Sequence, residues 1–385
     1  MRFGARNSLF LLNDFKRGLE YLEEARAIAV ELKDEERLGQ LLTWMTAHWN
    51  LAGNSEQAIV IGRQAIEHTT GPSTRDANIV SHYFLGIANY NLGRFKTAVD
   101  ELKTALELIP KEREFERFGT TGILSVLCKT WLLRSLAQMG QFDQTQRYGE
   151  AALRTAVERD HPFSIVYACY ANGAVAVLHG DFAQAIAMLE RGLKVCDAAE
   201  IPVQRPLLVS CLAVAYAFVG RLSDALELLN RGNDTHHAAL AVETGQAPLG
   251  KALSTVWDVQ TLILAGRFGE AESLAQHGLN FFRDGKDRGS EAWLTYLLGE
   301  IWARSDGPQS ARAEVSYGAA AVLAEQLGMR PLQDHCQLGL ARLQVKAHQA
   351  QGARAQYYAV AELFRTMGAP FWAAESERAG AAIGS

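Results

Sequence analysis

The feature that most constrains this chain is a short turn that recurs along it. The stretch NLGRFKTAVDEL begins at Asn91, and near-copies follow as QMGQFDQTQRYGE (138–150), LHGDFAQAIAMLE (178–190), FVGRLSDALELLN (218–230) and LAGRFGEAESLAQ (264–276). The turn glycines are spaced by 40, 47, 40, 40 and 46 residues: Gly53, Gly93, Gly140, Gly180, Gly220 and Gly266. Weaker members lie near Gly307 and His348, at further steps of 41 residues. A period of roughly 20–50 residues predicts a solenoid of stacked repeats.

Each repeat predicts two helices joined by the turn. After the turn, apolar residues follow one another at steps of 3, 1, 3, 3, 1 and 3: Phe95, Ala98, Val99, Leu102, Ala105, Leu106 and Ile109. These steps place them on one face of a helix. Before the turn, the apolar residues of 79–88 do not alternate as a strand would. The unit is therefore a helix hairpin, and it must stack on its neighbours to cover its apolar faces.

Small and aromatic residues have predicted roles at the turn. Glycine lets the chain leave the first helix with a positive φ angle. The aromatic or aliphatic residue two positions later should staple the turn to the core: Phe95, Phe142, Phe182, Leu222 and Phe268. A small residue further on should let the two helices approach closely: Ala58, Ala98, Ala185, Ala225 and Ala271, with Thr145 as the exception.

The unit from His82 to Pro110 resembles the tetratricopeptide repeat. Seven positions match that family's pattern: Leu85, Gly86, Gly93, Phe95, Ala98, Ala105 and Pro110. His82 and Asn89 stand where the family prefers tryptophan and tyrosine. The resemblance implies an all-α fold, a right-handed superhelix of about eight helix hairpins with an extra helix at each end. We expect a partial repeat with an orphan second helix at 1–33, tandem repeats at 34–370 and a capping helix at 371–385, so that the chain begins in mid-repeat.

Three stretches carry a second, more specific resemblance. ERFGTTGILSVLCKTWLL (116–133), RDHPFSIV (159–166) and LGMRPLQDHCQLGLARL (327–343) are similar to the C-terminal repeat region of bacterial class III adenylate/guanylate cyclases that carry an ATPase module. This resemblance implies a regulatory role in signal transduction. Two alternatives stay open: the chain is a fragment of a nucleotide cyclase or ATPase signalling enzyme, or it is the repeat region of an ATP-dependent transcription activator. The activator would need a helix-turn-helix, which the 15 residues after Pro370 are too few to hold.

The charge and the cysteines of the chain limit which partners and which cellular compartment we expect. The net charge is −5 and there is no run of Lys or Arg, so neither nucleic acid nor a membrane surface is an expected partner. The apolar stretches 162–180 and 206–220 read as buried helices rather than membrane spans. Five cysteines without a C-x-x-C pair are typical of reduced, buried thiols. With no secretory signal at the N-terminus, these features predict a cytoplasmic protein.

No motif predicts catalysis, a cofactor or a metal. GQAPLGKA (245–252) resembles a phosphate-binding loop, but Ala252 stands where Ser or Thr should hold Mg²⁺, and no strand precedes it. His236-His237 and Asp334-His335-Cys336 lack the spacing of metal ligands. We therefore expect a non-enzyme. Nucleotide chemistry at 245–252 is the enzymatic alternative.

The remaining candidate surface is the concave groove of the superhelix. The resemblance implies that the first helix of each hairpin lines this groove. Tyrosine, tryptophan and arginine make good anchors for a protein or peptide partner because they bury area at low entropy cost. The repeat spacing places these predicted binding residues there: Tyr83, Tyr90, Arg134, Tyr167, Tyr170, Trp293, Tyr296 and Glu300. It adds Asn50, Asn91, Gln138, Gln260, Arg304, His335 and Arg342. Packing between neighbouring repeats is the alternative role for each.

Overall fold

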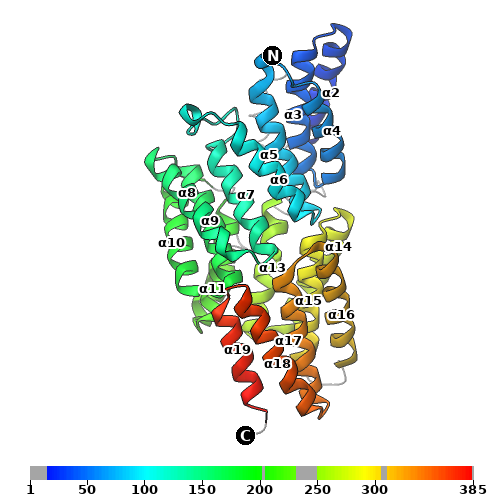
Figure 1. Cartoon of the computed structure of the whole chain (residues 1–385), viewed down its shortest axis with the longest axis vertical. Coiled ribbons are helices and arrows are strands. Elements are labelled where there is room, and N and C mark those ends of the chain that lie inside the picture. Colours follow the sequence, from blue (N-terminus) through cyan, green and yellow to red (C-terminus); the bar gives the residue numbers. More distant parts are fainter. Residues whose placement is uncertain (1–14, 202–203, 231–248, 305–309, 384–385) are drawn as a thin grey trace.

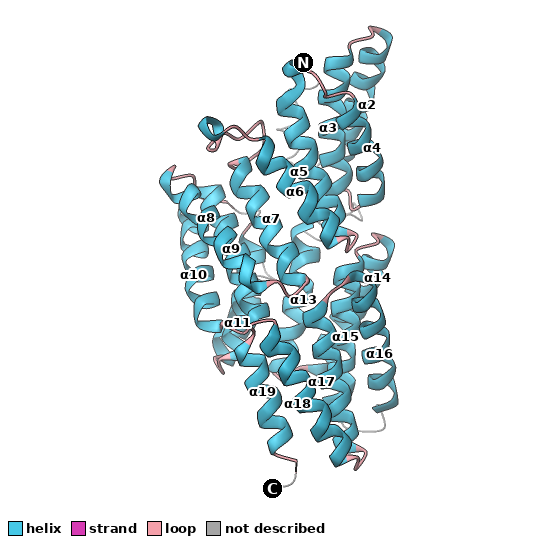
Figure 2. Ribbon diagram, in the orientation of Figure 1, coloured by secondary structure: helices cyan, strands magenta, loops and turns pink. Residues whose placement is uncertain are grey.

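The computed structural model describes residues 15–201, 204–230, 249–304 and 310–383, and within these ranges every long element is an α-helix (Figure 2). The first half contains α2 (Phe15–Glu31), α3 (Glu35–Leu51), α4 (Ser55–Glu67), α5 (Arg75–Asn91), α6 (Phe95–Leu108), α7 (Leu124–Gln138), α8 (Phe142–Glu158), α9 (Pro162–His179) and α10 (Phe182–Ala198). The second half contains α11 (Arg205–Phe218), α13 (Leu249–Leu264), α14 (Phe268–Asp284), α15 (Arg288–Arg304), α16 (Ser310–Leu327), α17 (Arg330–Lys346), α18 (Ala350–Thr366) and α19 (Pro370–Ala381).

The helices pair in the order that the repeat predicts. The described part of the chain holds eight hairpins, α3/α4, α5/α6, α7/α8, α9/α10, α11 with the helical residues 222–230, α13/α14, α15/α16 and α17/α18. Helix α2 precedes them and α19 follows them (Figure 1). The predicted all-α solenoid, with an extra helix at each end, is confirmed.

The turns have the backbone conformation that the glycines predict. The φ angle is positive, from 71° to 88°, at Gly53, Gly93, Gly140, Gly180, Gly220 and Gly266. His348 has φ of 61° where the repeat lacks its glycine, so the turn geometry persists without it. Gly307 lies outside the described residues. The turns that join one hairpin to the next also use positive φ, at Lys33, Asp160, Glu200 and Lys286, which the sequence pattern did not predict.

The predicted small positions are fully buried. Ala58, Ala98, Ala185, Ala225 and Ala271 each have 0 % exposure, as close helix contact requires. The staples behave less uniformly. Phe95, Phe142 and Phe182 are buried, but Phe268 is half-buried and Leu222 is 37 % exposed, so the prediction for Leu222 is wrong.

The staples differ because the solenoid winds back on itself. Helices α13 to α19, yellow-green to red in Figure 1, lie along the ends of the blue to green helices α4 to α9. In this arrangement α15 contacts α5, and α17 contacts α7. The second superhelical turn thus covers hairpin turns of the first one. Phe182 is one example, because its ring centroid lies 4.9 Å from that of Phe371 on α19.

Close contacts fix this seam between the superhelical turns. Added Cβ atoms would lie 2.9 Å from Leu327 at Gly93, 2.5 Å from Met367 at Gly140 and 2.7 Å from Phe371 at Gly180. Polar groups also cross the seam: Trp372 Nε1 donates to the Leu178 carbonyl at 2.9 Å, Trp293 Nε1 donates to Gln138 Oε1 at 3.1 Å, and His179 Nε2 lies 2.6 Å from the Gly368 carbonyl. These contacts hold the two superhelical turns together.

The stretches tested as membrane spans form α9 and α11, whose residues are mostly buried. No helix in the described ranges combines the length and hydropathy needed to cross a bilayer. All five cysteines are buried and unpaired, as their sequence pattern predicts.

Candidate functional site: a chamber inside the superhelix

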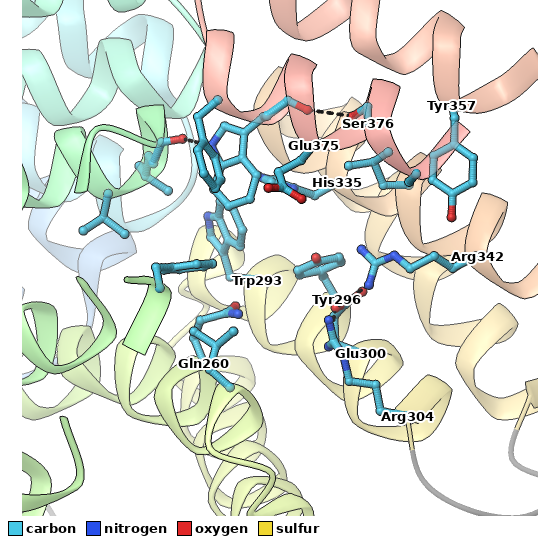
Figure 3. Close-up of a pocket in the computed structure, with 18 of the residues that line it drawn as sticks. Gln260, Trp293, Tyr296, Glu300, Arg304, His335, Arg342, Tyr357, Glu375 and Ser376 are labelled. Carbon is cyan, nitrogen blue, oxygen red and sulfur yellow. Dashed lines mark hydrogen bonds and ion pairs between the residues drawn. The ribbon is translucent and has the colours of Figure 1, made fainter. Parts of the chain in front are cut away.

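A chamber of 440 Å³ lies where the second superhelical turn closes against the first (Figure 3). Its volume falls within the roughly 300–1,000 Å³ of typical ligand pockets. The walls come from the first helices of successive hairpins, α9, α11, α13, α15 and α17, together with α19 and one residue of α18. The chamber is therefore built by the repeat, because five successive hairpins present their first helices to it.

Aromatic rings form much of the chamber wall. Three tryptophans, Trp257, Trp293 and Trp372, line it together with Tyr296 and Phe218. Both Trp293 and Trp372 use their indole N–H groups in bonds across the seam, which fixes their rings in place. The Phe218 and Trp372 centroids lie 5.6 Å apart, and those of Trp293 and Tyr296 lie 6.0 Å apart. Such rings provide large apolar area without flexible side chains.

A buried carboxylate organises the polar end of the chamber. Glu300 is 2 % exposed and lies between two arginines (Figure 3). It accepts hydrogen bonds from Tyr317 Oη at 2.6 Å and Arg342 Nη1 at 2.9 Å, and forms an ion pair with Arg304 Nη1 at 2.5 Å. Burial alone would raise the pKa of Glu300, but Arg342, Arg304 and the Tyr317 hydroxyl outweigh it and lower this pKa to about 2. Glu300 therefore stays ionised.

The two arginines extend from Glu300 toward solvent. The Arg304 side chain is 37 % exposed and the Arg342 side chain is 36 % exposed, although their common partner Glu300 is buried. A guanidinium has five N–H donors, so one bond to Glu300 leaves others available on each arginine. Opposite them, Glu375 of α19 pairs with Arg378. Glu300 carries one negative charge and the two arginines carry two positive charges, so the three side chains together have a net charge of +1.

His335 lies among the aromatic rings of the wall. Its ring centroid is 4.7 Å from that of Trp372 and 5.9 Å from that of Tyr296. Burial lowers the pKa of His335 to about 4, which the neighbouring Glu300 opposes. The adjacent Asp334 has a pKa raised to about 7 by burial. At neutral pH the imidazole is therefore neutral and acts as one more ring of the wall.

A second aromatic cluster lies beside the chamber. Arg134 is 7 % exposed, and its Cζ lies 4.3 Å, 4.9 Å and 5.5 Å from the ring centroids of Trp131, Tyr90 and Tyr170. Its Nη2 donates to Tyr90 Oη at 3.4 Å. Stacking on several rings offsets part of the cost of burying the guanidinium. Asp287 is partly buried in the second superhelical turn. Burial raises its pKa to about 6, and hydrogen bonds from Ser290 and the charge of Arg134 oppose this rise.

The predicted groove residues fall into separate groups. Trp293, Tyr296, Glu300, Gln260, Arg304, His335 and Arg342 line the chamber. Tyr90, Arg134 and Tyr170 form the neighbouring cluster, and Gln138 bonds Trp293 across the seam. Tyr83 and Tyr167 lie outside the chamber, packed in the core around Trp131. Asn50 and Asn91 are buried between hairpins, where they donate to the Phe84 carbonyl and to Ser55 Oγ. Which of these residues contact a partner stays a prediction.

The sequence reasoning missed several chamber residues. Trp257 and Phe218 are on first helices, and the repeat spacing could have found them. Trp372 lies on α19, in the stretch predicted to be a cap. A signal was present, because Pro370 is the first residue of α19 and Pro331 is the second residue of α17, and in both cases a positive-φ glycine, Gly368 or Gly328, lies two residues before the helix begins. The tail thus repeats the start of a first helix, and its residues reach the interior.

The stretch 245–252 and His236-His237 lie wholly or largely outside the described residues. Within the described ranges, no group of three or more His, Cys, Asp and Glu side chains is arranged to hold a metal ion.

No protein-family model matches this sequence. No curated protein matches it. Solved structures do resemble it. One is a Rap protein complexed with competence and sporulation factor. The alignment covers 99 % of this chain and 96 % of the Rap chain, with 12 % sequence identity and a TM-score of 0.55. The human IFIT1 dimer with PPP-AAAA aligns with 99 % of this chain and 82 % of its own, at 14 % identity and a TM-score of 0.53, and the dimer with m7Gppp-AAAA gives a TM-score of 0.51. At such low identity, the likeness establishes the fold, a tetratricopeptide-like α-solenoid.

Proposed function

We propose that this chain is a non-catalytic binding module that holds a peptide segment of a protein partner in the chamber. The observation that carries the proposal is the chamber itself, a partly open, aromatic-walled space of 440 Å³ that is lined by helices of both superhelical turns. Rigid aromatic anchors beside a few charged groups are typical of binding hot spots. The Rap structure, solved with competence and sporulation factor, supports the idea that a solenoid of this shape takes up a partner.

The protonation states of the chamber also favour binding over catalysis. A general acid or base works best with a pKa near the working pH. Two arginines and a tyrosine hold the pKa of Glu300 at about 2, and burial holds the pKa of His335 at about 4. Ser376 Oγ donates to the Trp372 carbonyl at 2.7 Å. These groups suit fixed recognition of a ligand better than proton transfer.

The signalling context is a further part of the proposal. In this view the partner is a cyclase or ATPase module that the chain regulates in the cytoplasm, as the repeat stretches predict. None of the comparisons supports this context. Reading the frame encoded upstream of Met1 tests it, because an in-frame ATPase or cyclase would make the chain part of such an enzyme. An unrelated neighbouring sequence would remove the basis for the prediction.

A selection experiment tests the binding proposal. Displayed random peptides would be selected on the immobilised chain and then tested against the variant Ala379→Trp. Ala379 lines the chamber, so a tryptophan there would occupy part of its volume. Ala374→Trp is the matched control, because Ala374 is exposed on the same helix. We expect selected peptides to lose binding to Ala379→Trp and to keep it with Ala374→Trp. Peptides that bind both variants equally would overturn the proposal.

A further inference from the structure

The charged end of the chamber has a property that a purely apolar peptide would not use. Glu300 is fully engaged, since its two oxygens accept from Tyr317, Arg342 and Arg304. The arginines are not neutralised to the same extent, because two guanidinium groups share one carboxylate. Arg342 extends along the chamber wall with a side chain that is 36 % exposed, and within the described ranges Glu300 is its one hydrogen-bond acceptor.

The contacts with Glu300 fix the positions of both arginines, as binding of an anion requires. Glu300 is anchored in the core by Tyr317, whose ring has 0 % exposure, so the carboxylate cannot follow its partners outward. Arg342 and Arg304 therefore meet at a fixed point, and each guanidinium has further N–H donors besides the one that contacts Glu300. Guanidinium groups bind carboxylates through two parallel hydrogen bonds, and they are less strongly hydrated than ammonium groups.

The excess charge decides which anion fits. One unshared positive charge matches one carboxylate, whereas a polyphosphate or an RNA chain would bring several negative charges close to Glu300 and Glu375. The whole chain is also acidic, with a net charge of −5, which opposes polyanion binding. The aromatic walls near the arginines, Tyr296, Trp293 and Trp372, then provide a place for a large apolar side chain next to the carboxylate.

We infer that the chamber recognises a peptide segment in which a carboxylate adjoins an aromatic or large aliphatic side chain, with Arg342 and Arg304 binding the carboxylate and the tryptophan walls binding the side chain. This inference rests on the proposed function and specifies its ligand. The carboxylate is either the C-terminus of a peptide or the side chain of an acidic residue, and both present the same chemistry to the arginines.

Three synthetic peptides test the inference by isothermal titration calorimetry. The first is an acetylated tripeptide of two alanines and a C-terminal phenylalanine with a free carboxylate, and the second is its amide. The third is an amidated peptide with glutamate after phenylalanine, which moves the carboxylate to a side chain. We expect the free acid or the glutamate peptide to bind at least tenfold more tightly than the amide, since hydrogen bonds between charged groups are stronger than those between neutral ones. Which of the two binds better identifies the source of the carboxylate.

Variants of the chain assign the effect to the arginines. Arg342→Gln should remove the tenfold preference, and Arg342→Lys should restore part of it because the charge is kept. Arg312→Gln is the matched control: Arg312 is 58 % exposed on α16 and is not among the chamber residues. If Arg342→Gln fails to fold, Arg304→Gln gives the same reading from a more exposed position.

The outcomes separate this inference from the proposed function. Equal binding of acid and amide, lost in both cases with Ala379→Trp, would overturn the carboxylate inference and leave peptide binding in the chamber intact. Absence of peptide binding at roughly 1 mM would overturn the inference as well. Binding of the oligonucleotide PPP-AAAA in the chamber, tighter than any of the peptides, would overturn it in favour of nucleic acid.

Discussion

Replacing His335 by phenylalanine should make the chamber region less sensitive to acid. The imidazole lies among aromatic rings with 7 % exposure, so a phenylalanine keeps most of its contacts with Trp372 and Phe364. Burial disfavours the charged imidazolium, and Arg342 disfavours it further, while Glu300 favours it. The balance lowers the pKa of His335 from 6.5 to about 4 in the folded chain.

The sign and size of the effect follow from these two pKa values. Above pH 6.5 the imidazole is neutral in both folded and unfolded chains and adds no pH dependence. Between pH 6.5 and 4 the unfolded chain takes up a proton that the folded chain does not, so the folded state loses stability as the pH falls. At pH 5 the loss is about 2 kcal/mol, obtained from pKa values of 6.5 and about 4.

Urea unfolding at pH 7 and pH 5, followed by tryptophan fluorescence, measures this difference. Fluorescence is the suitable probe because three tryptophans line the chamber and a repeat array can unfold in steps. Asp287 and Asp334 have pKa values raised to about 6 and 7, so their contribution to the stability of the folded chain falls as the pH rises, opposite to that of His335. Both proteins contain these two residues, so their effect cancels in the comparison. The wild-type chain should lose about 2 kcal/mol more than His335→Phe between pH 7 and 5. Equal changes in the two proteins would refute a buried neutral imidazole.

Two further predictions concern packing. Ala185→Leu should overpack the α9/α10 hairpin and lower stability by about 1–3 kcal/mol, because Ala185 has no exposed surface; an unchanged melting temperature would contradict the close helix approach. Gly180→Ala should destabilise the chain more than Gly220→Ala does. Both glycines have φ above 80°, so both variants carry backbone strain of about 1–2 kcal/mol, but only at Gly180 would the new Cβ meet Phe371, at 2.7 Å. Limited proteolysis should then cut near α19 in Gly180→Ala alone, and equal protection of the two variants would argue against the seam.

The hairpins were predictable because their signals are local. A glycine near each turn, a helical stripe after it and a small residue at a fixed offset are each set by neighbouring residues, and Gly93, Phe95 and Ala98 all have the predicted conformation or burial. Among the residues that the first-helix projection assigned to the groove, Tyr296 and Arg342 line the chamber.

The seam could not be predicted in the same way. The pitch of a solenoid accumulates from small rotations at each repeat, so no single residue encodes where one superhelical turn meets the next. Contacts such as Trp372 with Leu178 and Lys286 with Glu56 join residues that the repeat pattern places in unrelated units. Leu222 illustrates the consequence, because it has the sequence of a staple but is 37 % exposed. The tail helix α19 reads as a cap from sequence and closes the chamber in the folded chain.

A crystal structure of the chain with a peptide selected on it would show directly whether the chamber is the binding site. We expect density for the peptide inside the superhelix, with a side chain between Trp293 and Trp372 and a carboxylate on Arg342. Peptide density on the outer face of the hairpins, with the chamber empty and its side chains unmoved, would contradict it.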